Sequence, residues 1–259
     1  MANAPTVLVD RAGPVATVRL NRPENRNGII PELMTELYAA LKDIAADPST
    51  RVVVLRGEGA DFCPGADIKR YAGSDKPKRE TDPDEFKVAV LLHEMPQVTV
   101  AAITGACAGA GFGWACACDL RIASETAKFN TAFLDVGVAG DMGGPWTLPR
   151  LVGAAKAREL YFLPGKFDAA EALRIGLLSR VSSAAEFEDD VNALVARLAG
   201  AAPLAIIAMK ANFVAAEQVP FETYIEVESE KHRDIFRSED TTEAFRAFVE
   251  KRRPVFQGK

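Results

Sequence analysis

The sequence predicts an α/β fold built on a parallel sheet, and three observations carry this prediction. Short apolar runs rich in β-branched residues, at residues 52–55 and 98–103, have the length and composition of buried strands. Segments with helical spacing of apolar residues follow them along the chain. From residue 154 onward the pattern is almost entirely helical. Strands that alternate with helices favour one α/β core with a helical C-terminal third over two unrelated domains.

Composition and charge limit the class of protein. The 259 residues are 48% hydrophobic and 26% charged, which suits one large domain or one domain with a small appendage. A net charge of −5 does not favour binding to nucleic acid or to an anionic membrane. No apolar run approaches the roughly 20 residues that span a bilayer, and the N-terminus lacks the features of a signal peptide. Four cysteines without a disulfide spacing favour a reducing, cytoplasmic location.

The first part of the chain alternates strands and helices. Residues 6–9 and 15–20 are predicted to form a hairpin. Residues 31–46 have the apolar spacing of an amphipathic helix that begins at a proline and ends before Asp-Pro. Residues 73–84 are polar and dense in charge, which predicts a surface loop that could cover a site. Helical spacing resumes at residues 86–94, directly before the second apolar run.

The stretch after residue 98 is the centre of the functional argument. A strand at residues 98–103 leads through a glycine-rich turn into an apolar segment, residues 112–118, that is predicted to start a buried helix. Such a junction aims free backbone N–H groups and the positive end of a helix dipole at one point, where we expect a negative group to bind. Two short strands are predicted at residues 121–124 and 128–130, followed by a second glycine-rich loop at residues 135–144.

The C-terminal third is predicted to be a series of helices. The six predicted segments are residues 154–162, 168–174, 184–199, 203–217, 221–236 and 241–252.

Common catalytic and cofactor motifs do not fit this sequence. The glycines at the central turn resemble half of a dinucleotide-binding loop, but the third glycine of that motif would fall at Trp114. No glycine run is followed by Lys-Ser or Lys-Thr, and no nucleophile elbow is present. His93 and His232 lack metal-ligand spacing, and Cys116 and Cys118 are better explained by core packing. No metal is therefore expected, and chemistry would depend on backbone dipoles and carboxylates.

A second backbone-donor loop is available at residues 63–68, where Gly65 permits a tight turn into a helix. Two loops that each end at a helix N-terminus can place two N–H groups on one carbonyl oxygen. An oxyanion hole of this kind contributes on the order of a few kcal/mol per donor to a developing enolate.

Several segments of the sequence carry a family resemblance. They are RLNRPENRNGI, GEGADFCPGADIKR, TGACAGAGFGWACACDLRIAS, VGVAGDMGGPWTLPRLVGAAKARELYF and FVEKRRPVFQGK. They resemble, in order, consecutive blocks of the enoyl-CoA hydratase/isomerase (crotonase) superfamily, and they cover residues 20–259. The resemblance implies a crotonase-like spiral of ββα turns over residues 1–195 and a helical trimerisation region over residues 196–259.

The same resemblance implies a substrate and a binding site. The substrate is an acyl-CoA thioester, no cofactor is needed beyond the coenzyme A of the substrate, and the assembly is a homotrimer or a dimer of trimers. Ala66 and Ala110 match the two positions that donate backbone N–H groups to the thioester oxygen. Further substrate-binding or CoA-binding positions are Arg26, Asp67, Ile68, Phe133 and Phe256, the last from the same or a neighbouring subunit.

Two departures from the family pattern affect the reaction. Hydratases of this family carry one glutamate in the glycine-led helix, where this chain has Gly113, and a second where it has Phe133. Without either carboxylate, hydration would lose general acid–base assistance worth roughly 10²–10⁴-fold per proton transfer. Ordinary enoyl-CoA hydration is therefore disfavoured.

One carboxylate remains at a position used by isomerase-like and dehalogenase-like members, and it is Asp141. A single carboxylate can remove a proton from one carbon and return it to another, which is the minimum for double-bond migration. Asp141 could instead cap the following helix, and Glu85 or Glu94 could replace a missing acid. The favoured interpretation is an enoyl-CoA isomerase that uses Asp141. The alternatives are hydration or thioester hydrolysis with a non-standard acid, and an acyl-CoA-binding subunit of weakened activity.

Overall fold

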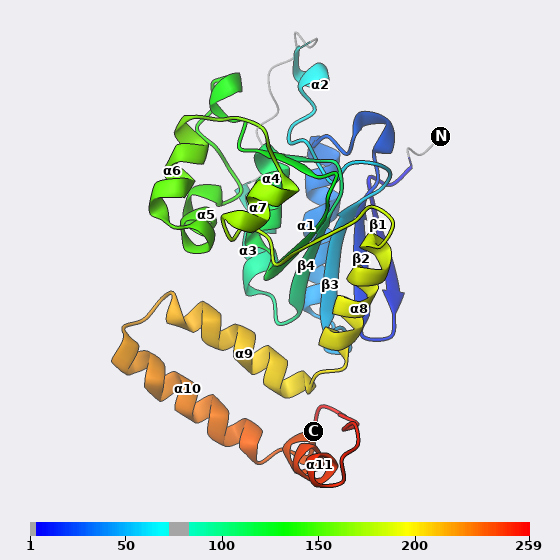
Figure 1. The fold of residues 1–259 in the computed structure, drawn as a ribbon, viewed down its shortest axis with the longest axis vertical. Helices are drawn as coiled ribbons and strands as arrows, with labels where there is room; N and C mark the ends of the chain where they lie inside the picture. Colours follow the sequence, from blue (N-terminus) through cyan, green and yellow to red (C-terminus); the bar gives the residue numbers. More distant parts are fainter. Residues whose placement is uncertain (1–3, 73–82) are drawn as a thin grey trace.

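The computed structural model describes residues 4–72 and 83–259, and a six-stranded sheet forms its centre (Figure 1). The strands lie in the order β1-β2-β3-β4-β6-β9. The first two pair antiparallel as a hairpin, and every later neighbour pairs parallel. Their bounds are β1 Val7–Ala12, β2 Val15–Leu20, β3 Val52–Gly57, β4 Val98–Ile103, β6 Leu120–Ser124 and β9 Arg180–Ser182.

A second, smaller sheet lies beside the first and has the order β5-β7-β8. Its strands are only two or three residues long: β5 Ala106–Ala108, β7 Lys128–Asn130 and β8 Phe167–Asp168. Strands β5 and β7 pair parallel, and β8 pairs antiparallel with β7. Because β5 directly precedes helix α4, this small sheet fixes where that helix begins.

Helices connect the strands and make up the C-terminal third. The α-helices are α1 Pro31–Ala45, α2 Ile68–Ala72, α3 Val88–Glu94, α4 Gly109–Ala117, α5 Gly144–Val152, α6 Ala154–Phe162, α7 Ala169–Arg174, α8 Phe187–Ala199, α9 Pro203–Ala216, α10 Phe221–Phe236 and α11 Glu239–Val249. Three short 3₁₀ helices are η1 Pro23–Asn25, η2 Pro83–Lys87 and η3 Leu134–Val136.

Both faces of the central strands β3 and β4 are buried, which explains their continuous apolar runs. All six residues of β4 are buried. Side chains such as Ala101 and Ile103 join the main core with α1, α3 and α4, whereas Val100 and Ala102 face a second cluster that includes Phe187 of α8. Successive side chains of a strand point to opposite faces, so a strand covered on both sides is apolar throughout.

Helices α9, α10 and α11 extend away from the sheet (Figure 1). Helix α9 is attached to the core by Lys210, whose ammonium lies 2.7 Å from the Asp119 carboxylate. The same ammonium donates to the Gln97 carbonyl at 2.8 Å. In the described part of the chain no single helix has the length and apolar composition to cross a bilayer, and α8 and α9 reach them only as a pair bent by 100°.

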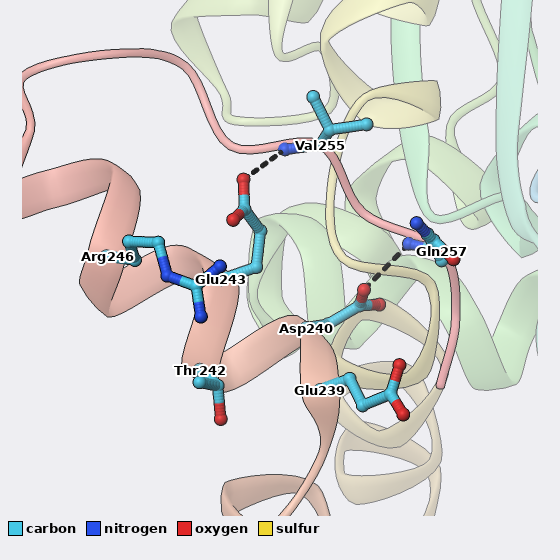
Figure 2. Close-up of a pocket in the computed structure, with 7 residues that line it drawn as sticks. All are labelled: Glu239, Asp240, Thr242, Glu243, Arg246, Val255 and Gln257. Atoms are coloured by element: carbon cyan, nitrogen blue, oxygen red, sulfur yellow. Dashed lines mark hydrogen bonds between the residues drawn. The ribbon is translucent and has the colours of Figure 1, made fainter.

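The C-terminal tail folds back on α11 and is held there through its backbone (Figure 2). The buried carboxylate of Asp240 accepts hydrogen bonds from the N–H groups of Gln257, at 2.7 Å, and Gly258, at 2.8 Å. Glu243, one turn further along α11, accepts from the N–H of Val255 at 3.0 Å. The end of the chain is therefore an ordered strap on its own last helix.

The predicted α/β class, with a parallel sheet and a helical C-terminal third, is confirmed. Helix α4 begins three residues earlier than predicted. The division into residues 1–195 and 196–259 stays a prediction; α8 and α9 meet at a bend of 100°. Helix α5 was not predicted, because Pro149 in its interior and the glycines before it are typical of a loop. Residues 73–82 of the predicted surface loop lie outside the described residues.

Candidate active site

Two backbone loops meet at one side of the sheet and form the first part of the site. The loop that follows Cys63 is joined to β5 by an isolated parallel bridge between Cys63 and Cys107. The Cys63 N–H donates to the Ala106 carbonyl at 2.8 Å, and the Ala108 N–H donates to the Cys63 carbonyl at 2.9 Å. These bonds place the loop beside the start of α4, although the two segments are far apart in the sequence.

Gly65 shows how closely the two loops approach. Its φ of +94° is strained for a residue with a side chain. A Cβ at this position would lie 3.1 Å from the Ala108 carbonyl oxygen and 3.6 Å from the Ala110 nitrogen. A glycine is therefore needed here for both reasons, and it brings residue 66 next to the first turn of α4.

The N–H groups of Ala66 and Ala110 are both available to a ligand. Ala66 forms a parallel bridge with Ile29, in which the Gly65 carbonyl accepts at 2.8 Å and the Asp67 N–H donates at 3.0 Å. In such a bridge the polar groups of the central residue point to the opposite side, away from its partner strand. Ala110 is the second residue of α4, where an N–H has no partner within the helix. Two donors thus lie on neighbouring loops, as an oxyanion hole requires.

Asp141 lies in the loop of residues 131–143 between β7 and α5, which includes η3, and its carboxylate is largely buried. The Oδ1 atom is inaccessible to solvent and has no hydrogen-bond partner among the described residues. Burial raises the pKa of Asp141 from 3.8 to about 6. A carboxyl group with a pKa close to neutral can both accept and return a proton at physiological pH.

The loop that carries Asp141 packs against α4, the helix that begins at the Ala110 donor, since a Cβ on Gly113 would lie 3.4 Å from the Asp141 carbonyl oxygen. Burial raises the pKa of Cys63 to about 12, and the negative charge of Asp141 adds to that increase. Cys63 stands three residues before Ala66, so the buried carboxylate and the backbone donors belong to one region. The three residues that were predicted to be catalytic therefore lie on segments in contact: the Ala66 loop packs against the start of α4, which carries Ala110, and Gly113 of α4 packs against Met142, the residue after Asp141.

Gly113 and Phe133 stand at the two positions where hydratases of the family carry glutamates. Both residues lie near Asp141. A Cβ on Gly113 would lie 2.7 Å from the Met142 Cβ, so the loop after Asp141 occupies the space of a side chain at this position. Phe133 is buried and stacks on Tyr161, with 6.1 Å between the ring centroids and 3° between the planes. The surroundings of Asp141 are thus apolar, which accounts for its raised pKa.

Tyr161 was not predicted from the sequence, because an aromatic residue in an amphipathic helix usually belongs to the hydrophobic core. Its ring is 3.6 Å from the position of a Cβ on Gly140, and its hydroxyl occupies the space beside Gly144. The hydroxyl oxygen is buried without a hydrogen-bond partner among the described residues.

Three predicted CoA-binding residues lie around the Ala66 loop and differ in their availability. The Arg26 side chain is 62% exposed and binds Asp61 through two bonds, of 2.7 and 3.0 Å. Asp67 forms an ion pair of 3.0 Å with Arg22, and both side chains are mostly buried. Ile68 is 57% exposed at the start of α2. Ile68 and the exposed part of Arg26 are thus accessible to a ligand, whereas the Asp67 carboxylate holds the loop in place.

Phe256 is not brought to this region within one chain. Its tail lies against α11, whereas α2 lies at the opposite end of the long axis (Figure 1). A contact between Phe256 and the site of a neighbouring subunit stays a prediction.

The other candidate acids and ligands have different surroundings. Glu85 is buried between η2 and α1, where the Thr35 hydroxyl donates to it, and Glu94 is exposed. His93 pairs at 2.8 Å with Glu217, the residue that follows α9. Within residues 4–72 and 83–259, no three His, Cys, Asp or Glu side chains are grouped as a metal site would require.

Known proteins resemble this chain over nearly its full length. The family model for enoyl-CoA hydratase/isomerase matches residues 10–259. A probable enoyl-CoA hydratase from Rhodobacter capsulatus is 33% identical over 255 residues, which is 98% of each chain. A carnitinyl-CoA dehydratase from Citrobacter koseri is 32% identical and covers 96% of this chain and 97% of its own. The crystal structure of an enoyl-CoA hydratase from Bacillus anthracis superposes with a TM-score of 0.92 at 30% identity, over 98% of this chain and 100% of that one.

Proposed function

The chain belongs to the enoyl-CoA hydratase/isomerase family of acyl-CoA enzymes and has its crotonase fold, and from that premise we propose that it moves the double bond of an enoyl-CoA, with Asp141 as the acid–base group. The observation that carries this proposal is the state of Asp141. Its carboxylate is largely buried, its Oδ1 atom has no hydrogen-bond partner among the described residues, and its pKa is raised to about 6. Positions 113 and 133 carry no carboxylate that could take part in proton transfer.

The proposed reaction needs one base and one oxyanion hole. The thioester oxygen accepts hydrogen bonds from the N–H groups of Ala66 and Ala110. The Asp141 carboxylate removes a proton from the α-carbon of a β,γ-unsaturated thioester, and the electrons of that C–H bond form a dienolate whose negative oxygen the two donors stabilise. Asp141 then gives the same proton to the γ-carbon, and the carbonyl reforms beside an α,β double bond. Atoms and charge balance without a co-reactant.

The surroundings of Asp141 favour isomerisation over hydration. Hydration needs one group to activate water and another to handle the α-proton, and each is worth roughly 10²–10⁴-fold. Phe133, Tyr161 and Met142 place apolar surface beside Asp141, and none of the three side chains carries a carboxylate that could act as the second general acid–base group that hydration needs.

The binding of coenzyme A and the assembly are part of the same proposal. Arg26 and Ile68, exposed beside the oxyanion loop, would contact the coenzyme, and Phe256 would come from a neighbouring subunit. We propose a homotrimer or a dimer of trimers in the cytoplasm, with no cofactor besides the coenzyme A of the substrate. Exposed aromatic side chains of the C-terminal helices, such as Phe213 at 70% and Phe248 at 85%, support a subunit interface there.

The test compares the wild-type enzyme with Asp141→Asn on β,γ- and α,β-unsaturated acyl-CoAs. Isomerisation by the wild type should fall below a pH of about 6, because Asp141 must be ionised to remove a proton. The Asn variant should lose at least roughly 10²-fold in kcat. Asp135→Asn, an exposed aspartate of the same loop, is the matched control and should keep full activity.

The alternative functions give different results in the same assay. Undiminished turnover by Asp141→Asn would remove Asp141 from the mechanism. A β-hydroxyacyl-CoA product or free coenzyme A would identify a hydratase or a hydrolase. Thioester binding without any turnover by the wild type would identify a binding subunit.

A further inference from the structure

Tyr161 of α6 packs against the loop that carries Asp141 and has no part in the reaction proposed above. Its ring stacks on Phe133 and contacts Gly140, two residues of the loop that carries Asp141. Its hydroxyl fills the space beside Gly144, where a Cβ would lie only 1.8 Å from the hydroxyl oxygen. The absence of a side chain at residue 144 therefore allows this hydroxyl to reach the loop.

Two buried polar atoms in this part of the structure lack a hydrogen-bond partner among the described residues. They are the Tyr161 hydroxyl oxygen and the Asp141 Oδ1. Buried polar groups in folded proteins almost always form hydrogen bonds, because an unmade bond costs the full desolvation of the group. The geometry places the hydroxyl near this carboxylate, because the Tyr161 ring contacts Gly140, its hydroxyl fills the space beside Gly144, and Asp141 lies between these two glycines in the chain. One is a donor and the other an acceptor.

We propose that Tyr161 is a positioning residue for Asp141, whose carboxylate accepts a hydrogen bond from one water molecule that in turn accepts a hydrogen bond from the Tyr161 hydroxyl. This role deepens the proposed function, because the carboxylate held in this way is the group that would move the proton. The bond would fix the orientation of Asp141 and stabilise its ionised form against the apolar surroundings. Loss of the hydroxyl should therefore act on proton transfer rather than on binding of the thioester.

Other titratable groups near this pair stay neutral over the relevant pH range. Cys63, from the oxyanion loop, and Cys116, from α4, are buried, and burial raises the pKa of each thiol to about 12. Burial likewise raises the pKa of the Tyr161 hydroxyl far above neutrality, so it remains a donor. Between pH 5 and 9 Asp141 is thus the titrating member of this group.

The test measures the ionisation of Asp141 directly in Tyr161→Phe, which keeps the ring and removes only the hydroxyl. The full-length protein is labelled with ¹³C at aspartate carboxyl carbons, and the Asp141 resonance is identified by its loss in Asp141→Asn. The titration midpoint of Asp141 should rise by about one pH unit in Tyr161→Phe, because the charged form loses a hydrogen bond. Tyr224→Phe, which removes a hydroxyl bound to Glu228 in α10, is the matched control and should leave the midpoint unchanged.

Kinetics on the same proteins separate this proposal from the proposed function. In Tyr161→Phe the acid limb of the isomerisation profile should move up with the midpoint, and kcat at pH 6.5 should fall several-fold with KM unchanged. An unchanged Asp141 midpoint in Tyr161→Phe overturns the role of Tyr161, whatever the activity. A shifted midpoint combined with full activity of Asp141→Asn keeps the hydrogen bond and overturns the proposed reaction.

Discussion

Gly113 of α4 is packed against Met142 so closely that a Cβ at residue 113 would lie 2.7 Å from the Met142 Cβ and 3.1 Å from its carbonyl oxygen. The helix that starts at the oxyanion hole and the loop that carries Asp141 therefore share this space. A glutamate at residue 113 and the present path of the loop exclude each other. The packing of Met142 against Gly113 thus both leaves no room for a glutamate at residue 113 and fixes the position of the loop that carries Asp141.

Gly113→Glu is therefore expected not to create a hydratase. The new side chain must displace Met142 and the backbone beside it, and overpacking of this kind typically costs about 1–3 kcal/mol. Isomerisation should fall because Asp141 moves with Met142. Thermal unfolding and assays of hydration and isomerisation check both expectations.

Gly165→Glu is the control, because a Cβ at residue 165 has nothing within 4 Å. It adds the same carboxylate in open space and should change neither the melting temperature nor the activity measurably. A Gly113→Glu enzyme that is as stable as the wild type and hydrates enoyl-CoA would contradict this expectation. It would show that Met142 and its loop move aside at little cost in stability.

Asp141 should lower the stability of the protein at neutral and alkaline pH. Its pKa is raised from 3.8 to about 6 in the folded state, so unfolding releases a carboxyl that ionises more easily. The folded state is stabilised by a protonated Asp141 below pH 4, and this stabilisation is lost as the pH rises through 6. Asp141→Asn, which cannot ionise, should therefore be more stable than the wild type at pH 8, by about 2 kcal/mol after allowance for partial exposure.

Urea denaturation at pH 4 and at pH 8 measures this effect. The advantage of Asp141→Asn should appear at pH 8 and vanish at pH 4, whereas Asp135→Asn, on the exposed part of the loop, should behave alike at both. If Asp141→Asn were less stable than the wild type at pH 8, the ionised Asp141 carboxylate would be well solvated in the folded protein.

The fold was largely predictable from the sequence because its buried strands are continuous apolar runs. β3 and β4 are covered on both faces, so their sequences differ plainly from the helices around them. The oxyanion loops were predictable because Gly65 and the glycines of α4 serve backbone geometry that few other residues allow. The resemblance to the family then attached a chemistry to these loops.

Features that depend on long-range packing could not be predicted in this way. Helix α5 contains prolines and follows glycines, and only its position against α4 and α6 makes it a helix. Tyr161 gains its place beside Asp141 from the bare backbone of Gly144, seventeen residues away. The location of Phe256 depends on carboxylates of α11 that hold the tail backbone.

Lys210 should be the main polar attachment between the C-terminal helices and the core. Its ammonium is buried and bonded to Asp119, at 2.7 Å, and to the Gln97 carbonyl. Lys210→Met keeps the apolar stem but leaves Asp119 without its cation, and breaking a buried pair in this way costs about 3–5 kcal/mol. The variant should unfold at lower urea concentration and be cleaved faster by protease near residues 200–202.

Lys156→Met serves as the comparison, because Lys156 pairs with Glu159 on the surface of α6. A surface pair contributes about 0–1 kcal/mol, so this variant should resemble the wild type in both measurements. Equal stability of the two variants would mean that Lys210 is not needed to hold α9 on the core.

Replacement of a backbone N–H tests the oxyanion hole most directly, and Ala66 is a suitable position. The residue is exposed, and its bridge to Ile29 uses the Gly65 carbonyl and the Asp67 N–H, so proline removes no ladder bond there. Ala66→Pro deletes one donor to the developing negative oxygen, and a single donor is worth about 10²–10³ in kcat. Steady-state kinetics should show this loss in kcat, with the melting temperature close to that of the wild type.

Ala154→Pro is the matched control for Ala66→Pro. Ala154 also follows a glycine with positive φ, is exposed, and is the first residue of α6, where proline is well tolerated. Because it lies outside the site, it should keep the wild-type kcat. If Ala66→Pro folds normally and also keeps the wild-type kcat, then the oxygen of the substrate is not held by the Ala66 N–H, and the charge must be stabilised by Ala110 and the helix dipole of α4 without it.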